Sequence, residues 1–122
     1  MFLEPSAGNG VFYNLFPQNK YGIDLNPQND QIIKMDFFNY LVSDKNVITI
    51  GNPPFGKNSS LAVKFFNHAA QFSNMICFIV PKTFQKYSIK QKLNNRFFLQ
   101  KLRKKDTTSS RRHMNCATTK TI

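Results

Sequence analysis

A proline-rich corner in the middle of the chain carries the residue types best suited to chemistry. Residues 51–56 read GNPPFG, and two consecutive prolines fix the backbone and remove two hydrogen-bond donors. Carbonyl oxygens, including the side-chain oxygen of Asn52, are then left as acceptors beside the flat ring of Phe55. Such groups suit a planar heterocycle with an exocyclic amine, stacked on Phe55 and held through its amine hydrogens by Asn52 and the Pro53 carbonyl. A rigid strand-to-helix turn without catalytic function is the alternative.

A second group of chemically capable residues consists of acids placed after predicted strands. Glu4, Asp24 and Asp36 are three of the six acids in the chain, and each falls at the carboxyl end of a predicted strand, where open parallel sheets bind ligands. Residues 5–10 after Glu4 read PSAGNG, and small residues let a backbone approach a ligand closely. Carboxylates at this edge would accept hydrogen bonds from a nucleoside-like ligand. An ordinary turn is the alternative, and the missing third glycine disfavours a nicotinamide enzyme.

The elements that must position these groups follow an alternating pattern. Short apolar runs alternate with helical periodicity, which predicts βαβ units around a parallel sheet. The predicted strands are 1–4, 20–25, 31–36, 46–51 and 75–80. The predicted helices are 10–16, 59–72 and 88–98. We therefore expect one α/β domain over residues 1–98, with a mostly parallel sheet and helices on both faces.

Length and charge restrict the partners. The 122 residues suffice for one small domain and include 17 Lys and Arg against 6 Asp and Glu, a formal charge of +11. This excess excludes an acidic disordered protein and predicts a polyanionic partner, most simply nucleic acid. Residues 99–122 are basic, rich in Ser and Thr and poor in large apolar residues, so we expect a disordered tail. That composition is typical of a nucleic-acid arm and of a solubilising tail alike.

The cysteines and the hydropathy pattern bear on metals, membranes and compartment. Cys77 and Cys116 are too few for a disulfide framework, which predicts a reducing intracellular setting, cytoplasmic or nuclear. Cys77 lies in a predicted strand as a small core residue, and His113 with Cys116 is too small a ligand set for zinc, so we expect no metal. The longest apolar run, 75–81, is far shorter than the roughly 20 residues of a membrane span. No signal peptide is visible.

Taken in order, these segments resemble the class I S-adenosylmethionine-dependent methyltransferases that methylate amino groups. LEPSAGNG at 3–10 is similar to the cofactor motif, GIDLNP at 22–27 to the ribose-binding motif, KMDFF at 34–38 to the adenine-contacting motif, and IGNPPFGKNS at 50–59 to the catalytic motif. Within this branch the chain is most similar to adenine-N6 methyltransferases of DNA modification systems and of large DNA viruses. The resemblance covers residues 1–98 and implies a Rossmann-like fold.

The resemblance also implies roles for individual residues. The implied cofactor-binding residues are Glu4, Pro5, Ala7, Gly8, Gly10, Asp24, Leu25, Asp36, Phe37 and Asn52. Glu4 and the turn after it would hold the methionine moiety, and Asp24 the ribose hydroxyls. Asp36 would contact the amine of the cofactor's own adenine, and Phe37 would pack on its ring. The implied catalytic residues are Asn52, Pro53, Pro54 and Phe55.

The implied activity is methyl transfer from S-adenosylmethionine to the N6 amine of adenine in DNA, with RNA as a second polymer to consider. Lys57, Lys82 and Lys86 are candidates for contacts with phosphate. No separate target-recognition domain fits in the length. Target choice would therefore need a partner subunit, or a basic surface with little sequence preference.

Two further functions stay open at this point. One is methylation of a glutamine amide in a protein, although related enzymes carry Tyr at the position of Phe55. The other is an inactive remnant that only binds the cofactor. The sequence after Phe98 lacks strand alternation, which predicts a truncated domain with an incomplete C-terminal hairpin.

Overall fold

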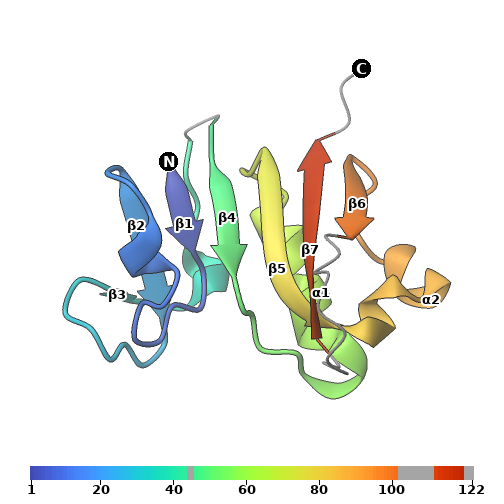
Figure 1. The fold of residues 1–122 in the computed structure, drawn as a ribbon, viewed down its shortest axis with the longest axis horizontal. Coiled ribbons are helices and arrows are strands. Elements are labelled where there is room, and N and C mark those ends of the chain that lie inside the picture. The colour runs from blue at the N-terminus through green and yellow to red at the C-terminus, as the bar shows by residue number, and fades with distance from the viewer. Residues whose placement is uncertain (44–45, 102–111, 120–122) are drawn as a thin grey trace.

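The fold is built on one mixed sheet (Figure 1). The computed structural model describes residues 1–43, 46–101 and 112–119, which form a seven-stranded sheet in the order β3-β2-β1-β4-β5-β7-β6. The strands are β1 Phe2–Glu4, β2 Lys20–Asp24, β3 Ile33–Lys34, β4 Ile48–Gly51, β5 Met75–Pro81, β6 Phe97–Lys101 and β7 Arg112–Thr119. Strands β1 to β5 pair in parallel, and β7 pairs antiparallel with β5 and β6. The expected mostly parallel sheet is confirmed.

The central strands form because their residues are apolar and β-branched. β4 reads ITIG and β5 reads MICFIVP, and such sequences fit strands that are covered on both faces. Ile76 and Val80 of β5 are fully buried. Parallel neighbours end at the same edge of a sheet, and Figure 1 shows the arrowheads of β1 and β4 side by side at that edge. The residues that follow these strands are thereby brought together.

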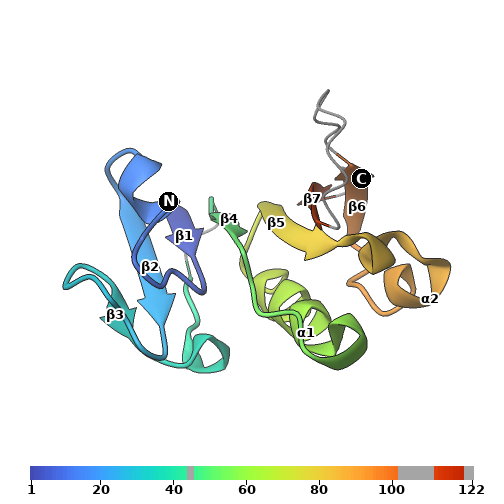
Figure 2. The same cartoon turned by 60° about the horizontal axis from the view of Figure 1, so that its bottom comes forward.

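Helical segments are short, and α1 is the longest of those described. The 3₁₀ turns are η1 Tyr13–Leu15, η2 Phe37–Asn39, η3 Lys57–Ser59 and η4 Lys82–Gln85, and the α-helices are α1 Ser60–Ala69 and α2 Tyr87–Lys90. α1 lies under β5, as Figure 2 shows. Its Phe66 ring meets the Phe78 ring at a centroid distance of 6.5 Å in the main core. This contact joins the helix that follows the proline corner to the centre of the sheet. No helix in the described residues is long and apolar enough to cross a bilayer.

Two of the three predicted helices differ from the structure. The helix predicted over 10–16 is reduced to η1, because Gly10 has a φ of +87° and Pro17 follows closely. The helix predicted over 88–98 contains only the end of α2. After α2 the Asn94 side chain accepts a hydrogen bond from the Arg96 N–H at 3.0 Å, an Asx turn that competes with helix. Phe97 then begins β6.

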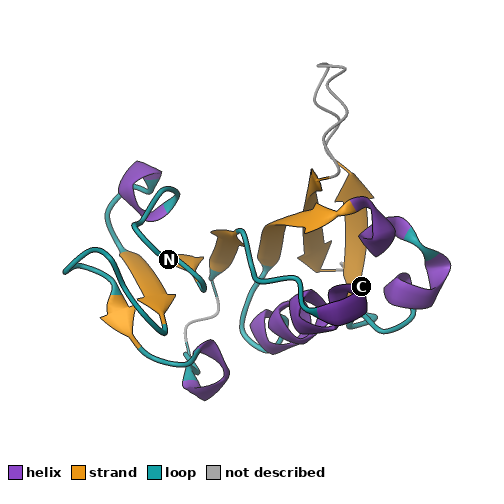
Figure 3. Cartoon of the chain, turned by 90° about the horizontal axis from the view of Figure 1, so that it is seen from below, coloured by secondary structure: helices purple, strands orange, loops and turns teal. Residues whose placement is uncertain are grey.

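The two faces of the sheet are covered unequally, and Figure 3 shows α1 along one of them. Ile23 of β2 belongs to the main core together with Phe65 and Phe66 of α1. On the opposite side, Tyr13 of η1 packs with Ala7 and Ile32 in a separate small cluster. A Cβ on Gly22 would lie 3.1 Å from the Tyr13 ring, so this glycine lets η1 pack closely on β2. Helical segments therefore cover both faces, as expected, although one cover is a single turn.

The expectation of a disordered tail over 99–122 is wrong for residues 99–101 and 112–119. These residues belong to β6 and β7, which form an antiparallel hairpin, so the expectation of an incomplete hairpin is wrong as well. β7 pairs with the whole of β5, from Met75↔Thr118 to Pro81↔Arg112. Composition alone missed this pairing, because β5 presents an unpaired edge whose backbone groups stabilise a polar partner strand. The tail prediction for 102–111 and 120–122 lies outside the described residues.

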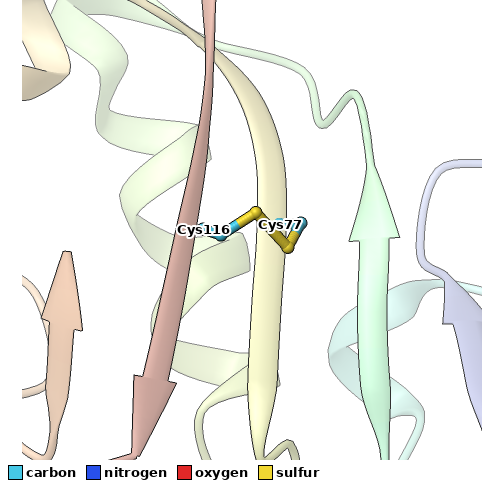
Figure 4. Close-up of a disulfide and its surroundings, with 2 residues drawn as sticks. All are labelled: Cys77 and Cys116. Atoms are coloured by element: carbon cyan, nitrogen blue, oxygen red, sulfur yellow. A yellow bond between two sulfur atoms is a disulfide. The ribbon is translucent and has the colours of Figure 1, made fainter. Parts of the chain in front are cut away.

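The two cysteines form a disulfide, which the expectation of a reducing setting did not anticipate (Figure 4). Cys77 of β5 and Cys116 of β7 are direct partners in the antiparallel register, with their Cα atoms 4.0 Å apart. They are 39 residues apart in the sequence. A cross-link of this kind stabilises a fold by about 2–4 kcal/mol, mainly by restricting the unfolded chain. The pairing fastens the C-terminal hairpin to the centre of the sheet.

Candidate functional site

The candidate site lies where the sheet order reverses between β1 and β4. Ligands bind at such a switch point in open α/β sheets, outside the carboxyl ends of the strands. Leu3 pairs with Thr49, and continuing this register places Pro5 beside Gly51 and Ser6 beside Asn52. A Cβ on Gly51 would lie 3.2 Å from Cδ of Pro5. Glycine at this position therefore lets the proline corner approach the N-terminal turn.

A cavity of about 370 Å³ opens at this meeting point. It is lined by Ser6 from the N-terminal turn and by Asn52, Pro53, Pro54 and Phe55 from the corner. Asn52 is exposed, and its side-chain amide makes no hydrogen bond to any residue that the structure describes. Phe55 is half-buried and packs on the main core. The cavity thus combines an available amide with a fixed aromatic ring.

The backbone after the cavity is held in an unusual path. Gly56 has a φ of +69°, and a Cβ there would lie 2.7 Å from Cβ of Leu61, so the position requires glycine. The N–H groups of Leu61 and Ala62 both donate to the Phe55 carbonyl, at 3.1 and 3.2 Å. The start of α1 therefore holds the backbone at the end of the proline corner.

A hydroxyl pair connects this corner to the segment after β5. Ser59 is buried and has a φ of +62°. Its Oγ lies 3.1 Å from Oγ1 of Thr83 in η4. This contact brings η4 next to η3 although their sequences are 24 residues apart. Sequence reasoning did not predict the Ser59–Thr83 contact or the place of Ser6 in the cavity. Both serines lie inside motifs that the sequence singles out, whereas Thr83 had no signal.

The N-terminal turn is organised by backbone donors. The N–H of Ala7 donates to the Ile23 carbonyl at 2.9 Å, and the N–H of Gly8 donates to Oδ2 of Asp24 at 2.8 Å. The N–H of Asn26 donates to the other oxygen, Oδ1, at 2.8 Å. Gly8 has a φ of +54°, and a Cβ there would meet no atom within 4 Å. The half-buried Asp24 carboxylate and the open backbone at Gly8 therefore lie together at the carboxyl edge of the sheet.

Glu4 is nearly inaccessible beneath this turn. Its side chain is 2% exposed, and its Oε2 accepts a hydrogen bond from the Tyr13 N–H at 2.7 Å. Burial raises the pKa of the Glu4 carboxyl to about 7, because desolvation disfavours the charged form more than the backbone hydrogen bonds favour it. A nearby cationic group would favour the ionised carboxylate.

The segment around Asp36 differs from its expected arrangement. Asp36 is exposed, and its Oδ1 accepts a hydrogen bond from the Phe38 N–H at 2.9 Å. Phe37 is 2% exposed and stacks on Phe65 in the core, with the ring centroids 5.1 Å apart. This placement disagrees with the expectation that Phe37 packs on a cofactor ring. Leu25, directly after Asp24, is 67% exposed.

The three candidate lysines lie on the side of the proline corner. Lys57 opens η3, Lys82 opens η4, and Lys86 follows η4; all three are exposed. The Ser59–Thr83 contact places the elements of Lys57 and Lys82 next to each other. Lys57 and Lys82 therefore lie on neighbouring elements, η3 after the proline corner and η4 after β5.

A second cavity of about 510 Å³ lies along the outer face of α1. Phe38, Leu61, Lys64, Asn67, His68 and Gln71 line it. His68 is buried rather than at the surface, and its Nε2 lies 2.7 Å from the Tyr40 carbonyl while its Nδ1 lies 3.3 Å from the Gln71 amide. Both ring nitrogens have partners, so this histidine has a structural role. No cluster of three metal-ligating side chains occurs in the part of the chain that the structure describes.

Similar folds occur among solved methyltransferase structures. The chain is 13% identical to the 23S rRNA methyltransferase ErmE, with a TM-score of 0.68, and the match covers 98% of this chain and 61% of that one. It is 13% identical to a putative rRNA methylase from Clostridium thermocellum (TM-score 0.59; 97% and 87% covered) and 11% identical to an rRNA methylase from Streptococcus thermophilus (TM-score 0.62; 97% and 85% covered). No family model and no curated protein matches the sequence. The likeness shows that the chain has a Rossmann-like methyltransferase fold, as expected.

Proposed function

We propose that the chain is an S-adenosylmethionine-dependent methyltransferase that acts on the exocyclic N6 amine of adenine in nucleic acid. The observation that carries the proposal is the shared cavity. Asn52 and Phe55 line it together with Ser6, and Ser6 belongs to the same turn whose Gly8 N–H donates to Asp24. A site for a planar amine and a site for a ribose therefore meet at one edge.

The N-terminal side fits the cofactor by the chemistry of its donors and acceptors. Each oxygen of Asp24 accepts one backbone N–H, and a carboxylate oxygen has a second lone pair for a ribose hydroxyl. The open space at Gly8 lets a ligand approach the backbone. Asp36 would accept a hydrogen bond from the amine of the cofactor's adenine. Glu4, 2% exposed, would shape the turn that faces the methionine moiety through its bond from the Tyr13 N–H rather than touch the cofactor. The buried Phe37 lies too deep for the ring contact, which leaves that ring to other side chains.

The proline corner orients the target amine. The bound cofactor provides a methyl group already activated by a positively charged sulfur. The Asn52 side-chain oxygen and the Pro53 carbonyl accept the hydrogens of the target amine, which aims the nitrogen lone pair away from the ring plane. As the nitrogen–carbon bond forms and the carbon–sulfur bond breaks, the same oxygens stabilise the positive charge on nitrogen. The nitrogen then releases one proton to water, and no strong base is needed. Phe55 stacks on the base, and Pro54 keeps the corner rigid.

The charge of the chain and the known neighbours support a nucleic-acid target. The similar structures are described as rRNA methyltransferases, which supports RNA. The motif resemblance favours DNA. A base in a duplex would have to leave its stack to reach Phe55, so in either polymer the substrate is an unpaired or flipped adenine.

The decisive experiment combines calorimetry of S-adenosylmethionine binding with transfer of a labelled methyl group. Single-stranded RNA, single-stranded DNA, duplex DNA and a glutamine-containing protein should be offered in parallel. We expect cofactor binding and label in a nucleic acid, recovered as N6-methyladenine after digestion. Label in the protein alone would replace the proposal by glutamine methylation. Binding without transfer to any substrate would identify a cofactor-binding remnant.

A further inference from the structure

One aromatic side chain stands out from the surface beyond the candidate site. Tyr87 of α2 is 76% exposed, against 43% for Tyr21 and 37% for Phe38, the next most exposed aromatics among the described residues. An exposed aromatic ring gains little from burial within its own fold. The cavity and its proposed chemistry do not use Tyr87, so its position needs another explanation.

The backbone around Tyr87 is anchored on both sides. Phe84 is 1% exposed and Ile89 is 7% exposed, and both belong to the main core. The Lys86 N–H donates to the Thr83 carbonyl at 3.0 Å, and the Lys90 N–H donates to the Lys86 carbonyl at 3.0 Å. Tyr87 is therefore held outward by buried residues before and after it. Presentation on a fixed backbone reduces the ordering cost of binding.

The charges around Tyr87 have one sign. Lys82, Lys86 and Lys90 are exposed in the same segment. No acid occurs anywhere in residues 46–101, which contain eight Lys and Arg. The positive potential of surface lysines is not reduced where the sequence supplies no carboxylates, so such a segment attracts a polyanion. The segment carries lysines on both sides of an aromatic ring. A nucleic acid carries phosphates on both sides of each base, so lysines can contact phosphates while the ring stacks on a base.

This segment continues directly from the candidate site. η3 begins at Lys57, just after the Phe55 corner, and the Ser59–Thr83 contact joins η3 to η4. η4 leads through Lys86 into α2, and Figure 1 shows α2 at the outer end of this path. Lys57, η4 and Tyr87 therefore form one series of neighbouring elements, which we call the η3–α2 track.

We propose that the η3–α2 track binds a single-stranded nucleic acid, with Tyr87 stacking on a base outside the target pocket and the lysines contacting phosphates. The inference rests on the proposed function, because it names how the substrate of that site is held. An unpaired base offers a free ring face, whereas a base in a duplex is already stacked. The target base must also be unstacked to reach Phe55. The track therefore selects single-stranded segments.

Fluorescence anisotropy with labelled strands of about ten nucleotides, near the site size of small single-strand binders, tests the inference on the full chain without cofactor. Single-stranded RNA, single-stranded DNA and a duplex of the same sequence form the arms. The variants are Tyr87→Ala, Tyr87→Phe and Lys86→Ala. Leu41→Ala and Lys34→Ala are matched controls, because Leu41 is 69% exposed and Lys34 lies on β3 at the far end of the sheet.

We expect Tyr87→Ala to weaken single-strand binding about tenfold, the loss of one stacked base, and Tyr87→Phe to restore it within about twofold of the wild type. Lys86→Ala should reduce the slope of affinity against salt by about one counterion, and both controls should bind normally. Unchanged binding by Tyr87→Ala, failure of Tyr87→Phe to restore binding, equal binding of the duplex, or no binding by the wild type would overturn the track. Because no turnover is involved, absent methyl transfer would refute only the proposed function.

Discussion

The two segments of the chain that meet at the cavity, residues 1–43 and 46–101, differ in their polar groups. In residues 1–43, Glu4, Asp24 and Asp36 each accept backbone N–H groups, so the acids are part of the turns that they border. In residues 46–101 no acid occurs, and the Asn52 amide makes no hydrogen bond within the described residues. The first side therefore consists of hydrogen-bonded carboxylates, whereas the proline corner of the second side offers the Asn52 amide, which has no hydrogen-bond partner among the described residues.

This contrast implies that a substitution can change activity without changing stability on the second side only. Under the proposed function, a substitution of Asp24 changes a turn and a ligand contact at once, because the oxygens that accept the backbone N–H groups also face the ribose. A substitution of Asn52 removes a functional group while the corner stays fixed by Gly56 and by the bonds from Leu61 and Ala62 to the Phe55 carbonyl. Stability and activity should therefore change together on the first side and independently on the second.

The largest expected effect tests the independence of the second side. Asn52→Ala should lower methyl transfer about 10²–10³-fold, the usual cost of removing one group that stabilises developing charge. The midpoint of thermal unfolding should stay close to wild type. Single-turnover rates and thermal unfolding measure the two effects separately.

Asn95→Ala is the matched control for that change, because Asn95 is exposed and lies far along the chain, before β6. It should leave the rate intact. Transfer at the wild-type rate by Asn52→Ala would refute the assigned chemistry. A large fall in stability would instead show that Asn52 is a structural residue like those of the first side.

Much of the fold was predictable because local patterns determine it. The runs ITIG and MICFIVP are apolar enough to specify β4 and β5, and the residues after each strand end meet because parallel strands end together. The pairing of the cavity residues follows from that rule and from Gly51, which allows the close approach to Pro5. Motif order therefore correctly predicted that the N-terminal turn and the proline corner meet at one edge of the sheet.

The remaining features depend on long-range partners. Phe37 follows Asp36 in a motif, yet it turns into the core because Phe65 of α1 offers a stacking partner. The hairpin of β6 and β7 forms along the edge of β5, which no local pattern in the tail reveals. The Cys77–Cys116 pair depends on the same register. The Ser59–Thr83 contact likewise joins two turns that only the folded sheet brings together.

The next effect concerns the buried acid of the first side. The pKa of the Glu4 carboxyl is about 7 in the folded chain, against 4.5 for an ordinary glutamate. As pH rises from about 4.5 to about 7, the unfolded chain releases this proton and the folded chain retains it, so folding stability falls across that window. Glu4→Gln removes this loss while keeping an acceptor for the Tyr13 N–H.

Urea denaturation at pH 5 and pH 8 measures the difference. The variant should gain up to about 3 kcal/mol over the wild type at pH 8, the equivalent of a shift of this size, and little at pH 5. Asn52→Ala should follow the wild-type profile, because the second side holds no acid. Parallel profiles for Glu4→Gln and the wild type would show that Glu4 does not retain its proton.

The smallest expected effect concerns Asp24, which is hydrogen-bonded in a turn and is proposed to bind the ribose. Asp24→Asn keeps the size of the side chain but replaces one acceptor oxygen with a donor, so it must lose the bond from either Gly8 or Asn26. We expect cofactor affinity to fall about tenfold and stability to fall by about 1.5–3 kcal/mol, as for a lost hydrogen bond to a charged group. Calorimetry and thermal unfolding report the two changes. Asp30→Asn, the same charge change at an exposed position nearby, should cause neither. If Asp24→Asn lowered affinity without lowering stability, the first side would resemble the second, and the division between them would rest on charge alone.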